Sequence, residues 1–197
     1  MSETRNRIIS ATNELFRVHG YHGTSLSEIS KAAAATIGSI YHFFPGGKES
    51  LTVAVIKSTG AIYRELFEMI AAEAADPTAA FVDFFEGAAA VLTESDFLDP
   101  CPIGTIAREV ASTNDVIRLA AREAFESWID AAAHQLTSAG VRSEVAHDLA
   151  ILFVATLEGS FIISRTQRSV EPMLAAGRRM APLIDAAVED GLRSRSD

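Results

Sequence analysis

Small and polar side chains gather near the start of this chain, at positions that a hydrophobic core does not favour. They offer hydroxyl, imidazole and ammonium groups, and one position without a side chain. The set comprises Thr24, Ser25, Thr36, Gly38, Ser39, Tyr41, His42 and Lys48. Donors of these kinds, together with the N–H groups at helix N-termini, bind phosphates and reach base edges. Recognition of a nucleic acid is therefore the chemistry that these residues can do.

Two short helices joined by a tight turn are predicted to hold these side chains in place. Ser25 and Glu28 form a Ser-x-x-Glu capping box, which starts the first helix. The second helix starts near Thr36 and ends at Pro45-Gly46-Gly47, because proline cannot continue a helix and glycines favour a turn. This layout is typical of a helix-turn-helix that reads the major groove of DNA.

The residues of the second helix divide into anchors and contacts. We expect apolar anchors at Ile37, Ile40 and Phe44. Base contacts are expected from Thr36, Ser39, Tyr41 and His42, and phosphate contacts from Thr24, Ser25 and Lys48. Gly38 lets the backbone approach a phosphate closely. The alternative is an ordinary helical hairpin, in which the hydroxyls serve as caps and the aromatic rings as core.

The composition is that of a folded globular protein, with 48% hydrophobic and 22% charged residues. We find no apolar run near the roughly 20 residues that cross a bilayer, and no signal-peptide pattern at the start, so the expected location is the cytoplasm and no membrane partner is expected. The single Cys101 cannot form an internal disulfide. The five histidines are scattered, so no metal and no cofactor are expected.

Charge is distributed unevenly along the chain, whose net charge is −9. Residues 1–58 carry six Lys or Arg and four Asp or Glu, whereas residues 59–197 carry 11 and 22. A polyanion repels the acidic body, residues 59–197, but does not repel the mildly basic head, residues 1–58. The asymmetry favours an approach to DNA with the first 58 residues in front.

Apolar residues recur at three- and four-residue spacing, which predicts an all-α protein of about nine helices. We expect a DNA-binding helix-turn-helix domain at residues 1–58 and a larger helical domain at 59–197. The predicted helices cover approximately residues 5–19, 25–33, 36–44, 48–75 and 78–92, a short helix that begins near 103, and then residues 115–136, 144–167 and 172–192.

Residues 4 to about 60 resemble the DNA-binding head of the TetR family of transcriptional regulators. The hallmark is a short recognition helix running into Tyr-x-x-Phe and then a Lys-Glu pair, seen here as Tyr41-His42-Phe43-Phe44 and Lys48-Glu49. Gly20-Tyr21, Thr24-Ser25, Ile29-Ser30 and Gly38-Ser39-Ile40-Tyr41 also fall at the family's spacing. The form Phe-Pro-Gly-Gly-Lys-Glu, with Cys101-Pro102 and Leu157-Glu158-Gly159, is similar to the LmrA/YxaF-like branch.

The resemblance implies a repressor that binds a palindromic DNA operator as a homodimer and is released by a small apolar or amphipathic effector. It makes several aromatic residues of the acidic body candidates for a ligand pocket, whereas their helical spacing alone indicates ordinary core packing. These candidates are Phe67, Phe84, Phe85, Cys101, Ile103, Phe125, Trp128 and Phe161. Core packing remains the alternative for each of them, and Cys101 can be a ligand contact, a thiol sensor or an inert apolar residue.

In the resembled family, the last two long helices form a four-helix dimer interface. The corresponding candidates here are Leu149, Leu152, Phe153, Thr156, Gly159, Ser160, Gly177, Met180 and Ile184. Packing within one chain is the alternative.

Two other classes of function were weighed. An enzyme needs a nucleophile with a base or a ligand cluster, and His134, His147-Asp148 and Glu158 stand without a surrounding motif. A helical small-molecule-binding protein without DNA activity is the second alternative. Thr36, Ser39, Tyr41 and Lys48 are the residues that argue against it.

Overall fold

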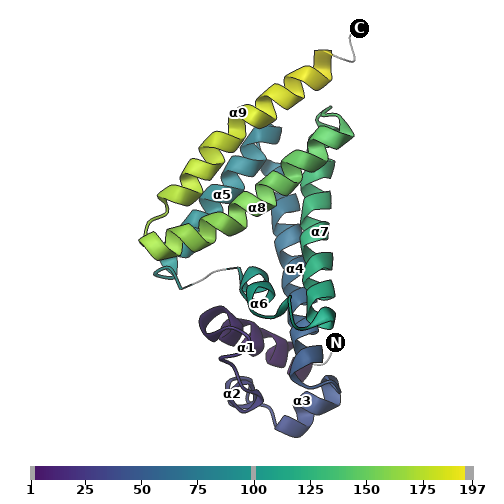
Figure 1. The fold of residues 1–197 in the computed structure, drawn as a ribbon, viewed down its shortest axis with the longest axis vertical. Coiled ribbons are helices and arrows are strands. Elements are labelled where there is room, and N and C mark those ends of the chain that lie inside the picture. Colours follow the sequence, from purple (N-terminus) through teal and green to yellow (C-terminus); the bar gives the residue numbers. More distant parts are fainter. Residues whose placement is uncertain (1–2, 99–100, 194–197) are drawn as a thin grey trace. The chain divides into compact units, whose positions relative to one another are not determined.

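The computed structural model describes residues 3–98 and 101–193, and within them the chain forms nine α-helices and no strand (Figure 1). The prediction of an all-α protein with about nine helices is confirmed. In chain order the helices are α1 Glu3–His19, α2 Leu26–Ala32, α3 Ile37–Phe43, α4 Lys48–Glu73, α5 Pro77–Glu94, α6 Pro102–Val110, α7 Asp115–Ser138, α8 Ser143–Gln167 and α9 Glu171–Arg193.

Local sequence signals explain several of the helix ends. Ser25 caps α2 and forms the predicted capping box with Glu28. Asp76 caps α5 by accepting a hydrogen bond from the backbone N–H of Ala79 at 2.8 Å, and Pro77 follows in the first turn. Gly20 ends α1 with a positive φ of 72°, a conformation that glycine adopts without steric cost.

The described residues pack as two units whose members are not consecutive in sequence. The first unit contains residues 3–62 and 101–124, and the second contains residues 63–98 and 125–193. Helices α4 and α7 contribute to both. Within the first unit, α6 packs against α1 (Figure 1). The sequence-based division at residue 58 thus separates α6 from the N-terminal helices with which it packs.

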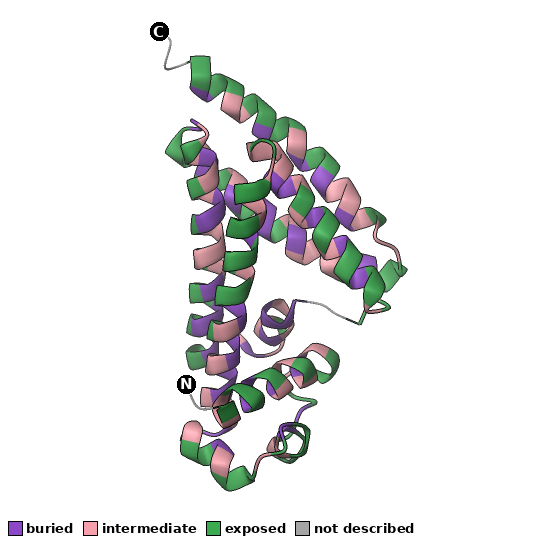
Figure 2. Ribbon diagram, turned by 180° about the vertical axis from the view of Figure 1, so that it is seen from behind, coloured by how far each residue is buried: buried purple, intermediate pink, exposed green. Residues whose placement is uncertain are grey.

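Aliphatic side chains dominate the core of the first unit. Its fully buried members, with no exposed surface, include Ile8, Phe16, Ile29, Ile40, Leu51, Ile56, Ile103, Ile106 and Ile117. They come from α1, α2, α3, α4, α6 and α7. The short helices α2 and α3 each bury one residue of the set and leave most of their other residues at the surface (Figure 2).

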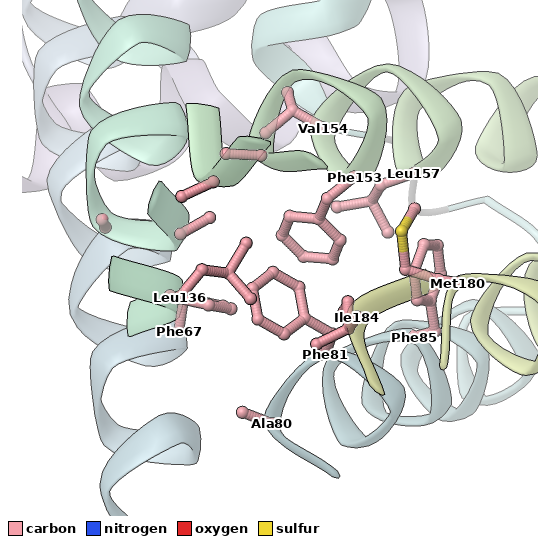
Figure 3. Close-up of a cluster of buried hydrophobic side chains, with 14 of the residues drawn as sticks. Phe67, Ala80, Phe81, Phe85, Leu136, Phe153, Val154, Leu157, Met180 and Ile184 are labelled. Atoms are coloured by element: carbon pink, nitrogen blue, oxygen red, sulfur yellow. The ribbon is translucent and has the colours of Figure 1, made fainter. Parts of the chain in front are cut away.

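Five phenylalanines form the centre of the second unit, and we call them the aromatic cluster. They are Phe67, Phe81, Phe84, Phe85 and Phe153. Most ring pairs of the cluster meet edge to face, as Phe81 and Phe153 do with centroids 5.0 Å apart (Figure 3). Helix α9 packs on α5 and α8 around them. A Cβ added at Gly177 of α9 would lie 3.1 Å from Phe85 Cβ, so the small residue permits this close approach.

Helix α8 is more apolar than the sequence analysis anticipated. By length and composition alone it is long and apolar enough to cross a membrane, a test that core helices of folded domains also pass. The expectation that no segment reaches this length is wrong for α8. One of its faces packs into the second unit through Ala150, Phe153 and Leu157, while Ile151, Leu152, Ile162 and Ile163 remain exposed.

Candidate nucleic-acid interface

The turn between α2 and α3 is closed by two hydrogen bonds that run in opposite directions. The N–H of Ala35 donates to the carbonyl of Ser30 at 3.0 Å, and the hydroxyl of Ser30 donates to the carbonyl of Ala35 at 2.6 Å. Ala34 occupies the left-handed region with φ at 46°, which sharpens the turn. These contacts fix the orientation of α3 relative to α2.

Helix α3 is anchored through one face and exposes the rest. Ile40 has no exposed surface and Phe44, its C-cap, is 3% exposed, as predicted for anchors. Ile37 is 42% exposed, so its predicted role as an anchor is wrong. Ile40 lies three residues further on and points inward instead. The remaining exposed positions of the helix are Gly38, Tyr41 and His42.

Two of the predicted base-contacting hydroxyls lie at the exposed start of α3. Thr36 caps the helix by accepting a hydrogen bond from the backbone N–H of Ser39 at 3.0 Å. The two hydroxyl oxygens are 2.9 Å apart, at hydrogen-bond distance. A Cβ at Gly38 would have one neighbour within 4 Å, the Thr36 hydroxyl oxygen at 3.7 Å. The start of α3 is therefore open and carries hydroxyl groups.

The start of α2 places one predicted contact outside and the other inside. Ser25 is exposed, and its backbone N–H and hydroxyl both donate to Glu28 Oε2 at 2.7 Å. These bonds lower the pKa of the Glu28 carboxyl, the hydroxyl contributing most. Thr24 is 1% exposed and its hydroxyl donates to the Gly20 carbonyl at 2.8 Å. Its side chain is thus used to fold the segment between α1 and α2.

Lys48 opens α4 and reaches back to the segment between α1 and α2. Its Nζ donates to the carbonyl of Tyr21 at 2.5 Å and lies 4.2 Å from the centroid of the Tyr21 ring. Partial burial lowers the pKa of Lys48, and the charges of Glu109 and Glu28 oppose this effect. Sequence analysis predicted the ammonium as a phosphate donor, and the structure gives it an internal partner as well.

Two arginines of α1 contact the neighbourhood of α3 and were not predicted as site residues. Arg7 Nε donates to the carbonyl of Ala33 at 3.2 Å, and the guanidinium of Arg5 lies 5.4 Å from the centroid of the Phe44 ring. Both contacts join residues 26 or more positions apart. The sequence signal that could have found them is the excess of basic residues in the first 58 positions.

The ligand-pocket candidates fall in both packing units. Phe67, Phe84, Phe85, Phe125, Trp128 and Phe161 belong to the second unit, whereas Cys101 and Ile103 belong to the first. Phe67 and Phe85 are buried in the aromatic cluster, and Phe125, Trp128 and Phe161 are half-buried beside the core. Cys101 is a buried free thiol that caps α6, its sulfur accepting a hydrogen bond from the N–H of Gly104 at 3.4 Å.

The dimer-interface candidates also separate into buried and accessible positions. Phe153, Ser160, Gly177, Met180 and Ile184 are buried within the second unit itself. Leu152 is 42% exposed, and Leu149, Thr156 and Gly159 are half-buried. Exposed apolar residues that the sequence analysis left out are Ile151, Ile162, Ile163 and Leu183.

Two family models match this chain, and together they span most of it. Residues 8–55 match the model of bacterial regulatory proteins of the tetR family, and residues 77–179 match the C-terminal domain of LmrA/YxaF-like transcriptional regulators. The chain belongs to the TetR family of transcriptional regulators. The first match contains α2, α3 and the start of α4, so the exposed residues described above lie within the segment that matches the tetR family model.

Individual TetR relatives agree with this assignment along the whole chain. The transcriptional regulator YxaF of Bacillus subtilis is 31% identical over 92% of this chain and 95% of its own length. LmrA of the same organism is 31% identical over 87% of this chain and 92% of its own length. The crystal structure of a TetR regulatory protein from Rhodobacter sphaeroides has the same fold, with a TM-score of 0.81, 22% identity, and coverage of 92% of this chain and 99% of that one.

The chain is therefore a DNA-binding transcriptional regulator of the TetR family. Its relatives are regulators and not enzymes, in agreement with the sequence analysis. The alternative of a ligand-binding protein without DNA activity loses its support because the head matches the family's DNA-binding model. Among the described residues there is no group of three or more His, Cys, Asp or Glu side chains that could hold a metal ion.

Proposed function

We propose that this regulator is a repressor that binds a palindromic operator as a homodimer and is released by a small apolar or amphipathic ligand. The observation that carries the proposal is the surface of α3. Only Ile40 of this helix is buried, while Gly38, Tyr41 and His42 face outward together with the Thr36 and Ser39 hydroxyls at its start. A helix that exposes donors and little bulk at its leading end fits the major groove.

Base contacts are assigned to Thr36, Ser39, Tyr41 and His42, and close backbone approach to Gly38. Phosphate contacts are assigned to Ser25 and Lys48. Ser25 is the exposed N-cap of α2, and its hydroxyl lies at the positive end of the helix dipole, which favours an anion. Thr24 supports Ser25 indirectly, because its hydroxyl donates to the carbonyl of Gly20 and so holds the segment before α2 in place. Arg5 and Arg7 add positive charge close to α3.

A second copy of the chain is the proposed partner for the exposed face of α8. This face carries residues that recur at helical spacing, namely Leu152, Thr156, Gly159 and Ile163. Leu152 and Ile163 are exposed on the protomer. A palindrome has two equivalent half-sites, so two-fold pairing of protomers matches its symmetry. On α9, Leu183 is also exposed, at 48%.

The effector is assigned to the second unit, near the half-buried aromatic residues. Phe84 of the aromatic cluster is only partly covered, and so are Phe125, Trp128 and Phe161, which pack against the core of this unit. Aromatic surfaces with few polar groups suit an apolar or amphipathic molecule. Phe67 and Phe85 of the same unit are the remaining proposed members of the pocket. The regulator acts in the cytoplasm, where its operator lies.

Fluorescence anisotropy tests the repressor proposal directly. Duplexes that tile the intergenic DNA beside the regulator's own gene are titrated at two salt concentrations, against a scrambled duplex of equal composition. We expect sequence-selective binding with two protomers per palindrome, and a loss of about tenfold or more in Lys48→Ala or Tyr41→Ala. Lys57→Ala is the matched control, because Lys57 is an exposed lysine of the same helix. Equal binding to scrambled DNA would contradict the proposal.

The dimer is tested separately by sedimentation velocity. Leu152→Glu places a charge on the proposed face of α8 and is expected to raise the dimer dissociation constant by at least about tenfold. Val91→Glu makes the same change at a 48%-exposed position of α5 and should leave the dimer intact. A Leu152→Glu variant that sediments as the wild-type dimer would remove α8 from the interface.

A further inference from the structure

The last turn of α6 contacts the segment that joins α1 to α2, residues 20–25, which we call the α1–α2 turn. Glu109 Oε2 accepts a hydrogen bond from the backbone N–H of His22 at 2.8 Å. A Cβ added at Gly20 would lie 1.9 Å from Glu109 Oε1. The carboxylate therefore occupies space that only glycine leaves open. It bonds a backbone group 87 positions away in sequence.

The same turn holds the ammonium of Lys48. Tyr21, which lies between Gly20 and His22, provides both the carbonyl that accepts from Lys48 Nζ and the ring beneath it. Ser25, the exposed cap of α2, ends the turn. A shift of the α1–α2 turn would therefore move the Lys48 partner and the start of α2 together.

A second contact joins the same region to the start of α4. Asn114 Nδ2 donates to Glu49 Oε2 at 2.6 Å, while Asn114 Oδ1 accepts from the N–H of Ile117 at the start of α7. Glu49 is the residue after Lys48. Glu109 of α6 and Asn114, just before α7, thus both contact residues around Lys48. Neither of them is itself assigned a DNA contact.

The charge of Glu109 and its position predict opposite effects on DNA binding. As a negative charge near a phosphate-binding lysine, Glu109 repels DNA, and its removal should strengthen binding. As the acceptor that holds His22, it keeps the α1–α2 turn in place, and its removal should weaken binding. The short bond to an otherwise exposed backbone N–H favours the second effect.

We propose that Glu109 is a positioning residue for DNA binding, which holds the α1–α2 turn through His22 and so places Lys48 and Ser25 for contact with phosphates. The proposal rests on the DNA contacts assigned under the proposed function. It makes α6, outside the helix-turn-helix itself, a part of the DNA-binding apparatus. A change in α6 would then reach the DNA contacts through one hydrogen bond.

Three substitutions at Glu109 separate position from charge. Glu109→Gln keeps an acceptor oxygen and removes the charge, whereas Glu109→Asp keeps the charge and withdraws the acceptor by one methylene. Glu109→Ala removes both. Glu86→Ala, at an exposed glutamate of α5, corrects for the change in net charge. Affinity for the selected duplex is measured by anisotropy, and exchange of the His22 amide by NMR in the free protein.

We expect Glu109→Ala and Glu109→Asp to lose about tenfold in affinity, with faster exchange at His22, and Glu109→Gln to stay within about threefold of wild type. Equal affinity in wild type and Glu109→Asp, or tighter binding by Glu109→Ala than by Glu86→Ala, would overturn the proposal. Wild-type protein that selects no duplex would overturn the proposed function and this role with it. The exchange data would still show whether the bond to His22 exists.

Discussion

Both packing units of this regulator have an apolar core, and they differ in the contacts that are most prominent in each. At the surface of the first unit, hydrogen bonds set the positions of the segments around α2 and α4, as in Lys48 to Tyr21 and Glu109 to His22. At the centre of the second unit, aromatic rings pack against one another, and Phe153 touches four other members of the aromatic cluster. Hydrogen bonds fix direction, and apolar packing fixes volume.

This difference fits the two tasks proposed for this regulator, DNA binding by the first unit and effector binding by the second. DNA contacts must be placed within the tolerance of a hydrogen bond, so directional contacts suit the first unit. A site for an apolar effector must accept a bulky molecule, and rings can rearrange at a smaller cost than buried polar groups. Substitutions should therefore act on stability in the second unit and on DNA affinity in the first.

The largest expected effect is on the stability of the second unit. Phe153 is 3% exposed, and its ring lies 5.0 to 5.7 Å from the rings of Phe67, Phe81, Phe84 and Phe85. Phe153→Ala removes the shared partner and leaves a cavity. We expect a decrease of about 3–5 kcal/mol in the free energy of unfolding, measured by urea denaturation.

The neighbouring position supplies the control. Leu152 is 42% exposed on the same helix, so Leu152→Ala should change the free energy of unfolding of the protomer by less than about 1 kcal/mol. The two variants must be compared at a protein concentration where the oligomeric state is the same. Equal losses at both positions would mean that α8 does not have one buried and one open face.

A smaller effect is expected where a single polar contact is removed from the first unit. Asn114→Asp keeps the oxygen that caps α7 but loses the donor to Glu49 and places two carboxylates together. We expect a loss of about 1–2 kcal/mol in stability, measured by denaturation, and weaker DNA binding. Asn6→Asp, at an exposed position of α1, is the matched control. Unchanged DNA affinity in Asn114→Asp would mean that the contact between Asn114 and Glu49 does not contribute to DNA binding.

The capping box of α2 gives the first unit a dependence on pH. The pKa of Glu28 is lowered in the folded protein by the Ser25 hydroxyl and N–H. A lowered folded-state pKa means that the contribution to stability is present above the unfolded value, 4.5, and is lost as the pH falls through the folded value. Thermal unfolding should therefore show a steeper loss below pH 4.5 in wild type than in Glu28→Gln. Parallel curves would exclude a role for the box in acid unfolding.

Local signals made the helices predictable from sequence. Caps such as Ser25 and Asp76, and glycines and prolines between helices, act over three or four residues, so the predicted ends agree with the structure to within a few positions. The faces of the helices were harder to predict. Helix α8 is apolar on most sides, so periodicity could not show that Phe153 points into the core while Leu152 points outward.

Contacts between distant residues could not be predicted in this way. The bonds of Glu109 to His22 and of Asn114 to Glu49 join positions 87 and 65 residues apart, without any motif around them. Within the candidate site, the burial of Ile40 and the exposure of Tyr41 and His42 agree with the sequence-based expectation. The exposure of Ile37 does not, because a helix of seven residues with one buried position has no repeat from which to predict a buried face.

The smallest expected effect concerns the turn between α2 and α3, where the backbone itself determines direction. Ala34 has φ at 46°, a conformation that costs an L-residue about 1–2 kcal/mol. Ala34→Gly removes that cost but loses about 0.5–1 kcal/mol to the greater freedom of the unfolded chain. We expect a net gain of about 0.5 kcal/mol in the free energy of unfolding. Ala35→Gly is the control, because Ala35 lies next to Ala34 and has no positive φ. This substitution should lower the free energy of unfolding by about as much as Ala34→Gly raises it.

DNA affinity shows what the turn contributes to the site. If Ala34→Gly gains stability but weakens DNA binding, the rigid turn is needed to hold α3 in the groove. Equal affinity would mean that the paired hydrogen bonds between Ser30 and Ala35 are sufficient to orient the helix.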